Sequence, residues 1–267
     1  MIAPSSPTAD PSTCTELAVW YRQTEQLDAS SLAAIDAVLS EDERERRDRF
    51  VFPDDRRDFG AAHALLRNVL SVHGVTAPGE WDFETNQSGK PAIVTSQAGT
   101  PPLVFNISHT RGLVACVVAR GTSVGVDVER STRMVGAREI ASRFFTESEL
   151  RILESCESGD YATRFIELWT LKEAYIKAVG VGLGLPLDSF GFDFEDPSRL
   201  RFISPDGDDG WQFWLAALSQ DARVAIAVAR GPMQRTWRIS FHQGEVDAAA
   251  DVMLLRSSGS GDDGEGL

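Results

Sequence analysis

Cysteine is scarce in this chain of 267 residues, and long apolar runs are missing from it. Three cysteines at wide spacing exclude a disulfide framework and a cysteine-based metal site, and they are typical of the reducing cytosol. No stretch approaches the ~18–20 consecutive apolar residues of a membrane span. The first residues also lack the basic and apolar regions of a secretory signal. We therefore expect a cytoplasmic protein without a membrane partner.

Positive charge is also scarce. The chain has 26 basic and 40 acidic residues, a net charge of −14, which argues against nucleic acid or an anionic membrane as a partner. The hydrophobic share of 42% and the charged share of 25% are those of an ordinary globular protein. The length exceeds the ~100–200 residues of a typical domain, which allows one large domain or two packed halves.

Lysine is the rarer of the two basic residues. The chain has three lysines, Lys90, Lys172 and Lys177, beside 23 arginines. A composition bias explains the excess of arginine most simply, but each remaining lysine is a candidate for a specific role. All three lie in the motifs described below.

A weak internal repeat indicates two similar halves. VACVVARG at 114–121 and VAIAVARG at 224–231 share six of eight residues at an offset of 110, which also pairs Arg67 with Lys177. Two ordinary strand and helix patterns are the alternative explanation. We interpret the repeat as a duplication, and we expect a loose tail over 1–13, an N-terminal half over 14–122, a C-terminal half over 123–242, and a short helix with a disordered acidic tail over 243–267.

Each half has the pattern of helices followed by strands. Ser40 with Glu43, and Thr146 with Glu149, fit capping boxes that begin a helix. Hydrophobic spacing then predicts longer helices and several strands. The helices are expected over about 56–73 and 160–180, and the strands over 103–108, 113–120, 123–129, 211–217, 223–229 and 236–241. Helices and hairpins in one chain predict the α+β class.

The segment SVGVDVE at 123–129 places two carboxylates on one face of a strand. Alternation points the valines toward a core and Gly125, Asp127 and Glu129 the other way. Carboxylates ~7 Å apart repel each other unless they are solvated, protonated or bridged by a cation such as Mg²⁺. Gly125 would leave room for a ligand on this face. A solvated acidic face of an edge strand is the alternative.

The segment WTLKEAYIK at 169–177 places Trp169, Glu173 and Lys177 along one helix face. Glu173 and Lys177 are in the favourable order for a helical ion pair, which stabilises a helix by only ~0.2–0.5 kcal/mol. That simple support is one interpretation. The other is a pair of charges at the edge of a core or cleft, beside a tryptophan of the kind that is usually buried.

The segment FNISH at 105–109 ends a strand in polar residues. Ser108 and His109 are adjacent on an extended chain and point to opposite faces, and no G-x-S-x-G sequence is present, so a serine hydrolase is disfavoured. A loop that binds an anion through hydroxyl, imidazole and backbone N–H groups fits better, and Lys90 on the Gly-Lys-Pro turn would add a charge. A plain polar strand end is the alternative.

Arginines cluster between residues 44 and 57. They suit a phosphate or carboxylate ligand, whereas the acidic residues among them favour a solvated helix face with salt bridges. The cluster comprises Arg44, Arg46, Arg47, Arg49, Arg56 and Arg57. No P-loop, dinucleotide fingerprint or zinc spacing occurs in the chain.

Taken together these motifs resemble the 4'-phosphopantetheinyl transferase superfamily. GVDVE at 125–129 and WxxKEAxxK at 169–177 look like its signature, and Gly-Lys-Pro at 89–91 with FNISH at 105–109 is similar to the long, single-chain Sfp type. The resemblance implies a pseudo-dimer of two similar α/β-sandwich halves, active as a monomer, with the active site between them. It would also account for the internal repeat.

The resemblance implies a reaction and a set of roles. The 4'-phosphopantetheine arm of coenzyme A would pass to a serine of an acyl or peptidyl carrier protein, with release of adenosine 3',5'-bisphosphate, in polyketide, non-ribosomal peptide or fatty acid synthesis. Asp127, Glu129 and Glu173 would hold Mg²⁺, and Glu173 and Lys177 would be catalytic. The expected ligands of coenzyme A are Arg46, Arg57, Lys90, Ser108, His109 and Lys172.

Two other functions stay open on the sequence. A catalytically silent protein that captures carrier domains is one, although such a protein has no need of Asp127, Glu129, Glu173 and Lys177 together. A Mg²⁺-dependent phosphohydrolase is the other, although the carboxylates or histidines for a second metal are not apparent.

Overall fold

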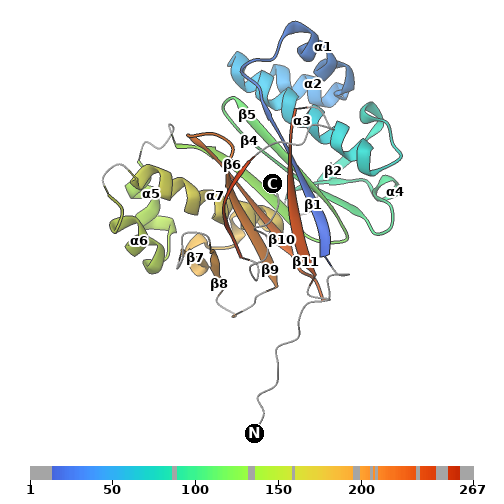
Figure 1. Ribbon diagram of the computed structural model, residues 1–267. Helices are drawn as coiled ribbons and strands as arrows, with labels where there is room; N and C mark the ends of the chain where they lie inside the picture. Colours follow the sequence, from blue (N-terminus) through green and yellow to red (C-terminus); the bar gives the residue numbers. More distant parts are fainter. Residues whose placement is uncertain are drawn as a thin grey trace.

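The computed structural model describes residues 14–85, 89–131, 136–157, 160–194, 199–204, 207, 210–232, 235–244 and 252–258. Within these residues two four-stranded sheets form the centre, in the orders β11-β1-β5-β4 and β12-β9-β10-β6 (Figure 1). The first sheet comprises β1 (Cys14–Gln23), β4 (Leu103–Thr110), β5 (Leu113–Arg120) and β11 (Thr236–Gln243). The second comprises β6 (Val124–Arg130), β9 (Trp211–Ala217), β10 (Ala222–Ala229) and β12 (Met253–Ser257).

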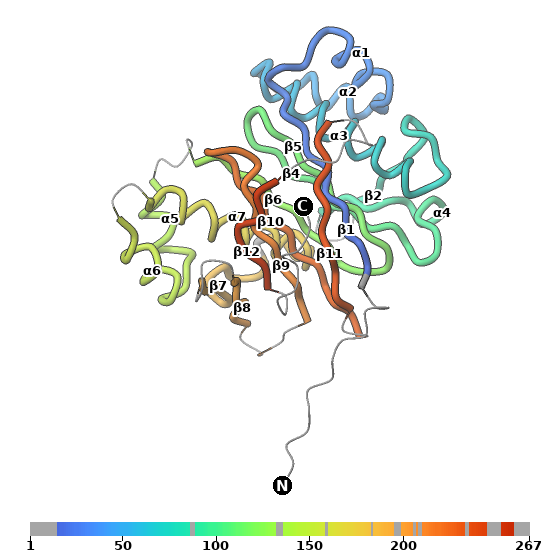
Figure 2. The backbone as a smooth tube through the Cα atoms, in the orientation of Figure 1, coloured from blue at the N-terminus to red at the C-terminus, as the bar shows by residue number. Residues whose placement is uncertain are grey.

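Helices cover the outer face of each sheet, and the α+β class predicted from the sequence is confirmed (Figure 2). The first sheet carries α1 (Ala29–Val38), α2 (Glu41–Asp48), α3 (Pro53–His73), the 3₁₀ turn η2 (Pro78–Glu80) and α4 (Thr95–Ala98). The second carries α5 (Ala137–Phe144), α6 (Glu147–Glu154), α7 (Tyr161–Val179), η4 (Gly182–Gly184) and η5 (Leu187–Ser189). Short ladders join β2 (Phe83–Thr85) to β3 (Pro91–Ile93) and β7 (Gly191–Asp193) to β8 (Arg201–Ile203). No helix among the described residues is long and apolar enough to span a bilayer.

Three buried clusters hold these layers together. One cluster lies between the two sheets and includes Val19, Val117, Val126 and Ile226. The other two lie between each sheet and its own helices. The order of elements repeats along the chain: one strand, three helices, a short two-stranded ladder and a long hairpin. The structure therefore has the repeated organisation that the sequence predicted.

The register of the repeat differs from the sequence match. At an offset of 110 Val114 pairs with Val224, but Val114 packs against the helices of its half while Val224 lies between the sheets. Strand side chains alternate, so a one-residue slip sends every side chain to the opposite face. The identities at this offset are thus not structural equivalents.

A buried ion pair ties the short capped helix to the long helix in each half. Both predicted capping boxes form, and the same glutamates bind a buried cation. Arg67 Nε donates to Glu43 Oε2 at 2.8 Å, and Lys172 Nζ lies 2.8 Å from Glu149 Oε2. Arg67 is therefore the counterpart of Lys172 and not, as the offset of 110 suggested, of Lys177.

The same two cations also bind the 3₁₀ turn that follows the long helix. Arg67 donates to the carbonyls of Pro78 and Trp81, both at 3.0 Å. Lys172 donates to those of Leu187 and Phe190, at 2.8 and 2.7 Å. Each cation thus joins three segments of its half.

The two C-terminal strands differ from the sequence expectation. We expected strand 236–241 to belong to the C-terminal half, but β11 pairs in parallel with β1 of the first sheet. We expected a short helix after residue 243, but the described residues there form β12, which pairs with β9. Each sheet edge offers unpaired backbone groups to any strand that reaches it, and the pattern of one strand does not tell which edge it joins.

Candidate active site

The two sheets meet where β4 runs beside β6. Polar side chains at alternate positions of β4 face β6, so they lie on one side of the strand. Asn106 Oδ1 accepts the backbone N–H of Val126 at 2.9 Å, and Ser108 Oγ accepts that of Val128 at 3.3 Å. These side chains satisfy backbone donors along the edge of β6. The N-terminal half thereby positions the acidic strand of the C-terminal half.

Asp127 lies at the centre of this seam and is 3% exposed. Its Oδ1 accepts hydrogen bonds from Ser108 Oγ at 2.9 Å and from Lys177 Nζ at 2.6 Å. Its Oδ2 is buried and has no hydrogen-bond partner among the described residues. The solvated acidic face is therefore the wrong interpretation for Asp127, which keeps one buried oxygen available for a cation.

Helix α7 brings Glu173 and Lys177 to the seam. It packs on β6 because Gly125 has no side chain: a Cβ there would lie 2.1 Å from the carbonyl oxygen of Ala174. The room that the sequence suggested for a ligand at Gly125 is thus filled by the helix backbone. Lys177 makes its ion pair with Asp127 on the neighbouring strand β6, and not along the helix with Glu173.

Glu173 is partly buried on α7 beside these charges. Withdrawal from water raises the pKa of Glu173, the negative charge of Asp127 raises it further, and the Lys177 ammonium opposes both. A carboxylate whose negative charge is disfavoured beside a second carboxylate forms a site that a divalent cation would stabilise.

Glu129 lies two residues beyond Asp127 on β6, and its Oε2 accepts a hydrogen bond from Thr110 Oγ1 at 3.3 Å. Within the part of the chain that the structure describes, no group of three or more His, Cys, Asp or Glu side chains is close enough to hold a metal ion by itself. The predicted set of Asp127, Glu129 and Glu173 is therefore not a closed cage. Mg²⁺ is commonly held by one or two carboxylates with substrate phosphates and water, and the residues present fit that mode.

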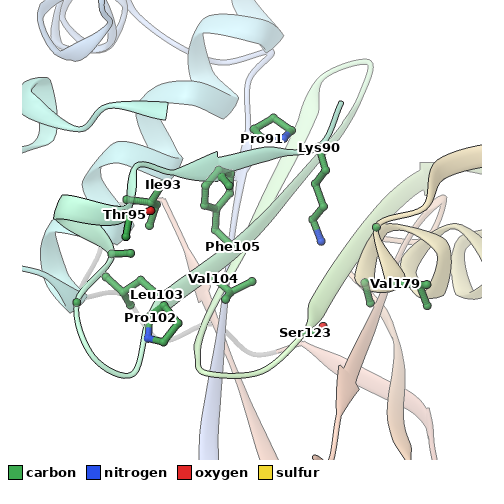
Figure 3. Close-up of a pocket in the computed structure, with 15 residues that line it drawn as sticks. Lys90, Pro91, Ile93, Thr95, Pro102, Leu103, Val104, Phe105, Ser123 and Val179 are labelled. Atoms are coloured by element: carbon green, nitrogen blue, oxygen red, sulfur yellow. The ribbon is translucent and has the colours of Figure 1, made fainter. Parts of the chain in front are cut away.

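Lys90 lies at one wall of a pocket of about 560 Å³ between the halves (Figure 3). Its side chain crosses from the first half toward the end of α7, where Nζ donates to the carbonyl of Lys177 at 2.5 Å. The pocket is lined mainly by apolar side chains, including Phe105 and Val179. Withdrawal from water lowers the pKa of Lys90 to about 8.

His109 follows Ser108 on β4, and its ring reaches the surface. Packing that withdraws the ring from water lowers the pKa of His109, and the Lys177 ammonium lowers it further. His109 is therefore near enough to Lys177 to share its electrostatic environment. The structure brings Lys90, His109, Asp127, Glu173 and Lys177 to the boundary of the halves.

Three of the six arginines in the cluster, Arg47, Arg49 and Arg57, pair with acids, as the salt-bridged alternative predicted. Arg57 pairs with Asp54 at 2.9 Å and with Asp58 at 3.3 Å. Arg46 is exposed, and its guanidinium carbon lies 5.5 Å from the centre of the Phe59 ring. Of the two predicted arginines, Arg46 therefore remains the more available to a phosphate.

The prediction that Lys172 binds coenzyme A is wrong. The side chain is fully buried, and its ammonium donates to two backbone carbonyls and pairs with Glu149. All three donors of a lysine are then used within the protein. Burial lowers the pKa of Lys172 and the Glu149 carboxylate opposes that change, so the residue supports the helix that carries Glu173.

Two residues of the seam were not predicted from the sequence. Asn106 and Thr110 bind β6 on either side of Ser108. The signal was present as the alternation of Asn, Ser and Thr with other residues over 106–110, which places the three on one face of a strand. Only the partner strand was unknown.

Comparisons with known proteins match both halves. A family model described as the 4'-phosphopantetheinyl transferase superfamily matches residues 123–229, and one described as 4'-phosphopantetheinyl transferase, N-terminal, matches residues 25–121. The 4'-phosphopantetheinyl transferase HetI of Nostoc sp. is 34% identical over 215 residues, covering 80% of this chain and 88% of that protein. The chain belongs to the 4'-phosphopantetheinyl transferase superfamily.

This transferase also resembles the 4'-phosphopantetheinyl transferase Sfp of Bacillus subtilis, with 32% identity over 64% of this chain and 73% of that protein. A solved holo-(acyl-carrier-protein) synthase of Bacillus anthracis is 21% identical and covers 40% of this chain and 94% of that chain, with a TM-score of 0.35. The Sfp type predicted from the motifs is confirmed by the similarity to HetI and Sfp and by the two matching family models.

Proposed function

We propose that this transferase moves the 4'-phosphopantetheine arm of coenzyme A to a serine of an acyl or peptidyl carrier protein. The serine oxygen forms a bond to the phosphorus that carries the pantetheine. The bond from that phosphorus to the bridging oxygen of the pyrophosphate breaks, and adenosine 3',5'-bisphosphate leaves. The family membership supports the reaction, and the seam between β4 and β6 supplies groups suited to it.

The observation that carries the proposal is the free oxygen of Asp127. A buried carboxylate oxygen without a donor is costly, and here it lies beside a second carboxylate, Glu173, whose charge is disfavoured. Asp127 and Glu173, with Glu129, would hold Mg²⁺ together with oxygens of the coenzyme A pyrophosphate. When bound, the ion would neutralise charge that develops on the phosphoryl oxygens.

The protein groups have separate roles in this proposal. Glu173, with its raised pKa, accepts the proton of the attacking serine directly or through a water molecule. Lys177 donates to the phosphate that leaves, from its place beside Asp127. Arg46, Lys90 and His109 bind other phosphates of coenzyme A at the boundary of the halves. Arg57 already pairs with Asp54 and Asp58, so we assign it no contact.

The proposed partner is a carrier domain of a polyketide, non-ribosomal peptide or fatty acid synthase, met in the cytoplasm by a monomer of this chain. Nucleic acid and membranes are not proposed as partners, because the net charge of −14 opposes both. One chain contains both halves of the seam, so a second copy is not needed to complete the site.

The test is the mass of a purified carrier protein after incubation with coenzyme A, Mg²⁺ and the enzyme. A gain of one phosphopantetheine supports transfer, and full turnover in excess chelator overturns the metal assignment. Asp127→Ala is expected to abolish the gain, whereas Glu147→Ala, at an 87% exposed side chain on α6, should not change it. Cleavage of coenzyme A without a mass gain would indicate hydrolysis. Capture of the carrier with neither result would indicate a silent binding protein.

A further inference from the structure

A second pocket, of about 220 Å³, lies at the end of the first sheet, where β1, β4, β5 and β11 meet the end of α3. Leu103, at the start of β4, is part of its wall. Ser108, which binds Asp127, is five residues further along that strand, a distance of about 17 Å. The pocket is therefore separate from the seam that holds Asp127.

This pocket repeats, in the first half, the position of the pocket between the halves. It is bounded by Thr15 near the start of β1 and by His73, the last residue of α3. The pocket between the halves is bounded by Ser123, just before β6, and by Val179, the last residue of α7. Because β1 and α3 occupy the same places in the repeat as β6 and α7, the two pockets are equivalent positions of the duplicated fold.

Both pockets also have a basic side chain at the end of the long helix. Lys90 Nζ donates to the carbonyl of Lys177 in the last turn of α7. The guanidinium of Arg120 donates to the carbonyl of His73 at the end of α3, and to that of Pro101 at 3.3 Å. A guanidinium has five N–H donors, so Arg120 keeps donors for a ligand.

Positive charge at this pocket is not balanced by acids. Within the part of the chain that the structure describes, Arg120 binds backbone carbonyls only, and the guanidinium of Arg235 has no hydrogen bond or ion pair. None of the described residues that line the pocket is acidic. Guanidinium groups bind phosphate through paired, charge-assisted hydrogen bonds. The two arginines are thus suited to a phosphate group.

Two buried nitrogen atoms of lining residues lack a hydrogen-bond partner among the described residues. They are Nε1 of Trp237, a residue that is 2% exposed, and Nε2 of His73. An indole N–H can only donate, so Trp237 needs an acceptor. A buried polar group without a partner is costly, and it indicates a water molecule or ligand that completes its bonds. A phosphate oxygen is such an acceptor.

We propose that this pocket binds a small phosphomonoester, at a site separate from that of coenzyme A. Arg120 and Arg235 bind the phosphate, and Trp237 Nε1 donates to one of its oxygens. The volume of about 220 Å³ lies below the ~300–1,000 Å³ of pockets for drug-sized ligands, so the organic part is small. Leu103 and Val118 provide an apolar wall for it. The inference does not depend on the proposed transfer reaction.

The experiment measures the Kd of monoethyl phosphate by isothermal titration calorimetry, with the full-length protein saturated with coenzyme A. Arg235→Gln removes a guanidinium that lines the pocket. Arg238→Gln is the matched control, because Arg238 is exposed on β11 and does not line the pocket. Loss of a charge-assisted hydrogen bond should raise the Kd ~10-fold or more in Arg235→Gln. The more distant charge should change it less than about threefold.

Nuclear magnetic resonance of the indole N–H groups locates the bound probe. Trp237→Phe identifies the resonance of Trp237 among the six tryptophans, and this resonance should shift as monoethyl phosphate is added to the wild type. An unshifted Trp237 resonance, an equal rise of the Kd in Arg238→Gln, or no binding of millimolar probe overturns the site. Binding that coenzyme A abolishes would place the probe in the pocket between the halves and overturns it too. If the wild type binds no coenzyme A, the proposed function fails, and the comparison of Arg235→Gln with Arg238→Gln still decides this proposal.

Discussion

The close packing of α7 on β6 at Gly125 leads to a specific prediction for Gly125→Ala. A Cβ at this position would lie 2.1 Å from the carbonyl oxygen of Ala174, 2.5 Å from the backbone nitrogen of Ala178 and 3.0 Å from its Cα. All three atoms belong to the helix backbone, so no side-chain rotation relieves the contact. The shortest distance is more than about 1 Å below an ordinary van der Waals contact, and α7 must move away from β6 by a similar amount.

The cost of that movement has two measurable parts. Overpacking of a core costs ~1–3 kcal/mol and sometimes more, and a contact with backbone belongs at the upper end. For a chain of this size each kcal/mol lowers Tm by ~2–4 °C, so we expect a decrease of ~6–12 °C. Glu173 and Lys177 lie on the same helix, and a ~1 Å misplacement of reacting groups costs ~10²-fold in rate.

The assay pairs thermal melting with the rate of carrier loading, measured well below the Tm of the variant. Gly79→Ala is the matched control, because a Cβ there meets no atom within 4 Å. It should melt and turn over like the wild type. A Gly125→Ala protein that melts within about 1 °C of wild type and keeps its full rate would refute the close approach of α7 and β6.

Three further predictions concern buried or partly buried charges. Lys172→Met leaves Glu149 and two carbonyls without their cation. The free energy of unfolding, measured in denaturant, should fall by ~3–5 kcal/mol, and a decrease below ~1 kcal/mol would contradict the structural role of Lys172. Burial alone would raise the pKa of Glu43, but hydrogen bonds from His63, Arg67 and Ser40 lower it from 4.5 to about 2. Glu43 therefore stabilises the fold above pH 4.5 by at most ~3 kcal/mol, and this contribution is lost as the pH falls toward 2. Glu43→Gln should flatten the dependence of folding stability on pH between 4.5 and 2. An unchanged dependence would count against the low pKa of Glu43. Withdrawal from water lowers the pKa of Lys90 to about 8. Since Lys90 binds a phosphate of coenzyme A in the proposed function, kcat/KM for coenzyme A should fall as the pH rises through 8. Lys90→Arg, which keeps its charge at that pH, should remove the fall.

Much of the secondary structure could be predicted from local patterns in the sequence. The capping boxes at Ser40 and Thr146 depend on residues three apart in the chain, and both formed as predicted. The strands 113–120 and 211–217 have the predicted bounds, since hydrophobic pattern and flanking turns define a strand locally. The motifs also led to the correct family, because residue types at fixed spacing are a property of the sequence itself.

The tertiary structure alone decided which side chains meet. Ser108 and Asp127 are 19 residues apart, and Lys177 is a further 50 residues along. Their contact depends on the position of β4 beside β6, at the edges of two different sheets, and on the approach of α7 at Gly125. The sequence placed Lys172 and Lys177 in one motif. Because the two lysines are five residues apart on a helix, they point in different directions: Lys172 lies in the core beside Glu149, and Lys177 lies at the seam. Residue chemistry and local spacing are determined by the sequence, whereas the partner of each charge follows from long-range packing that no local pattern contains.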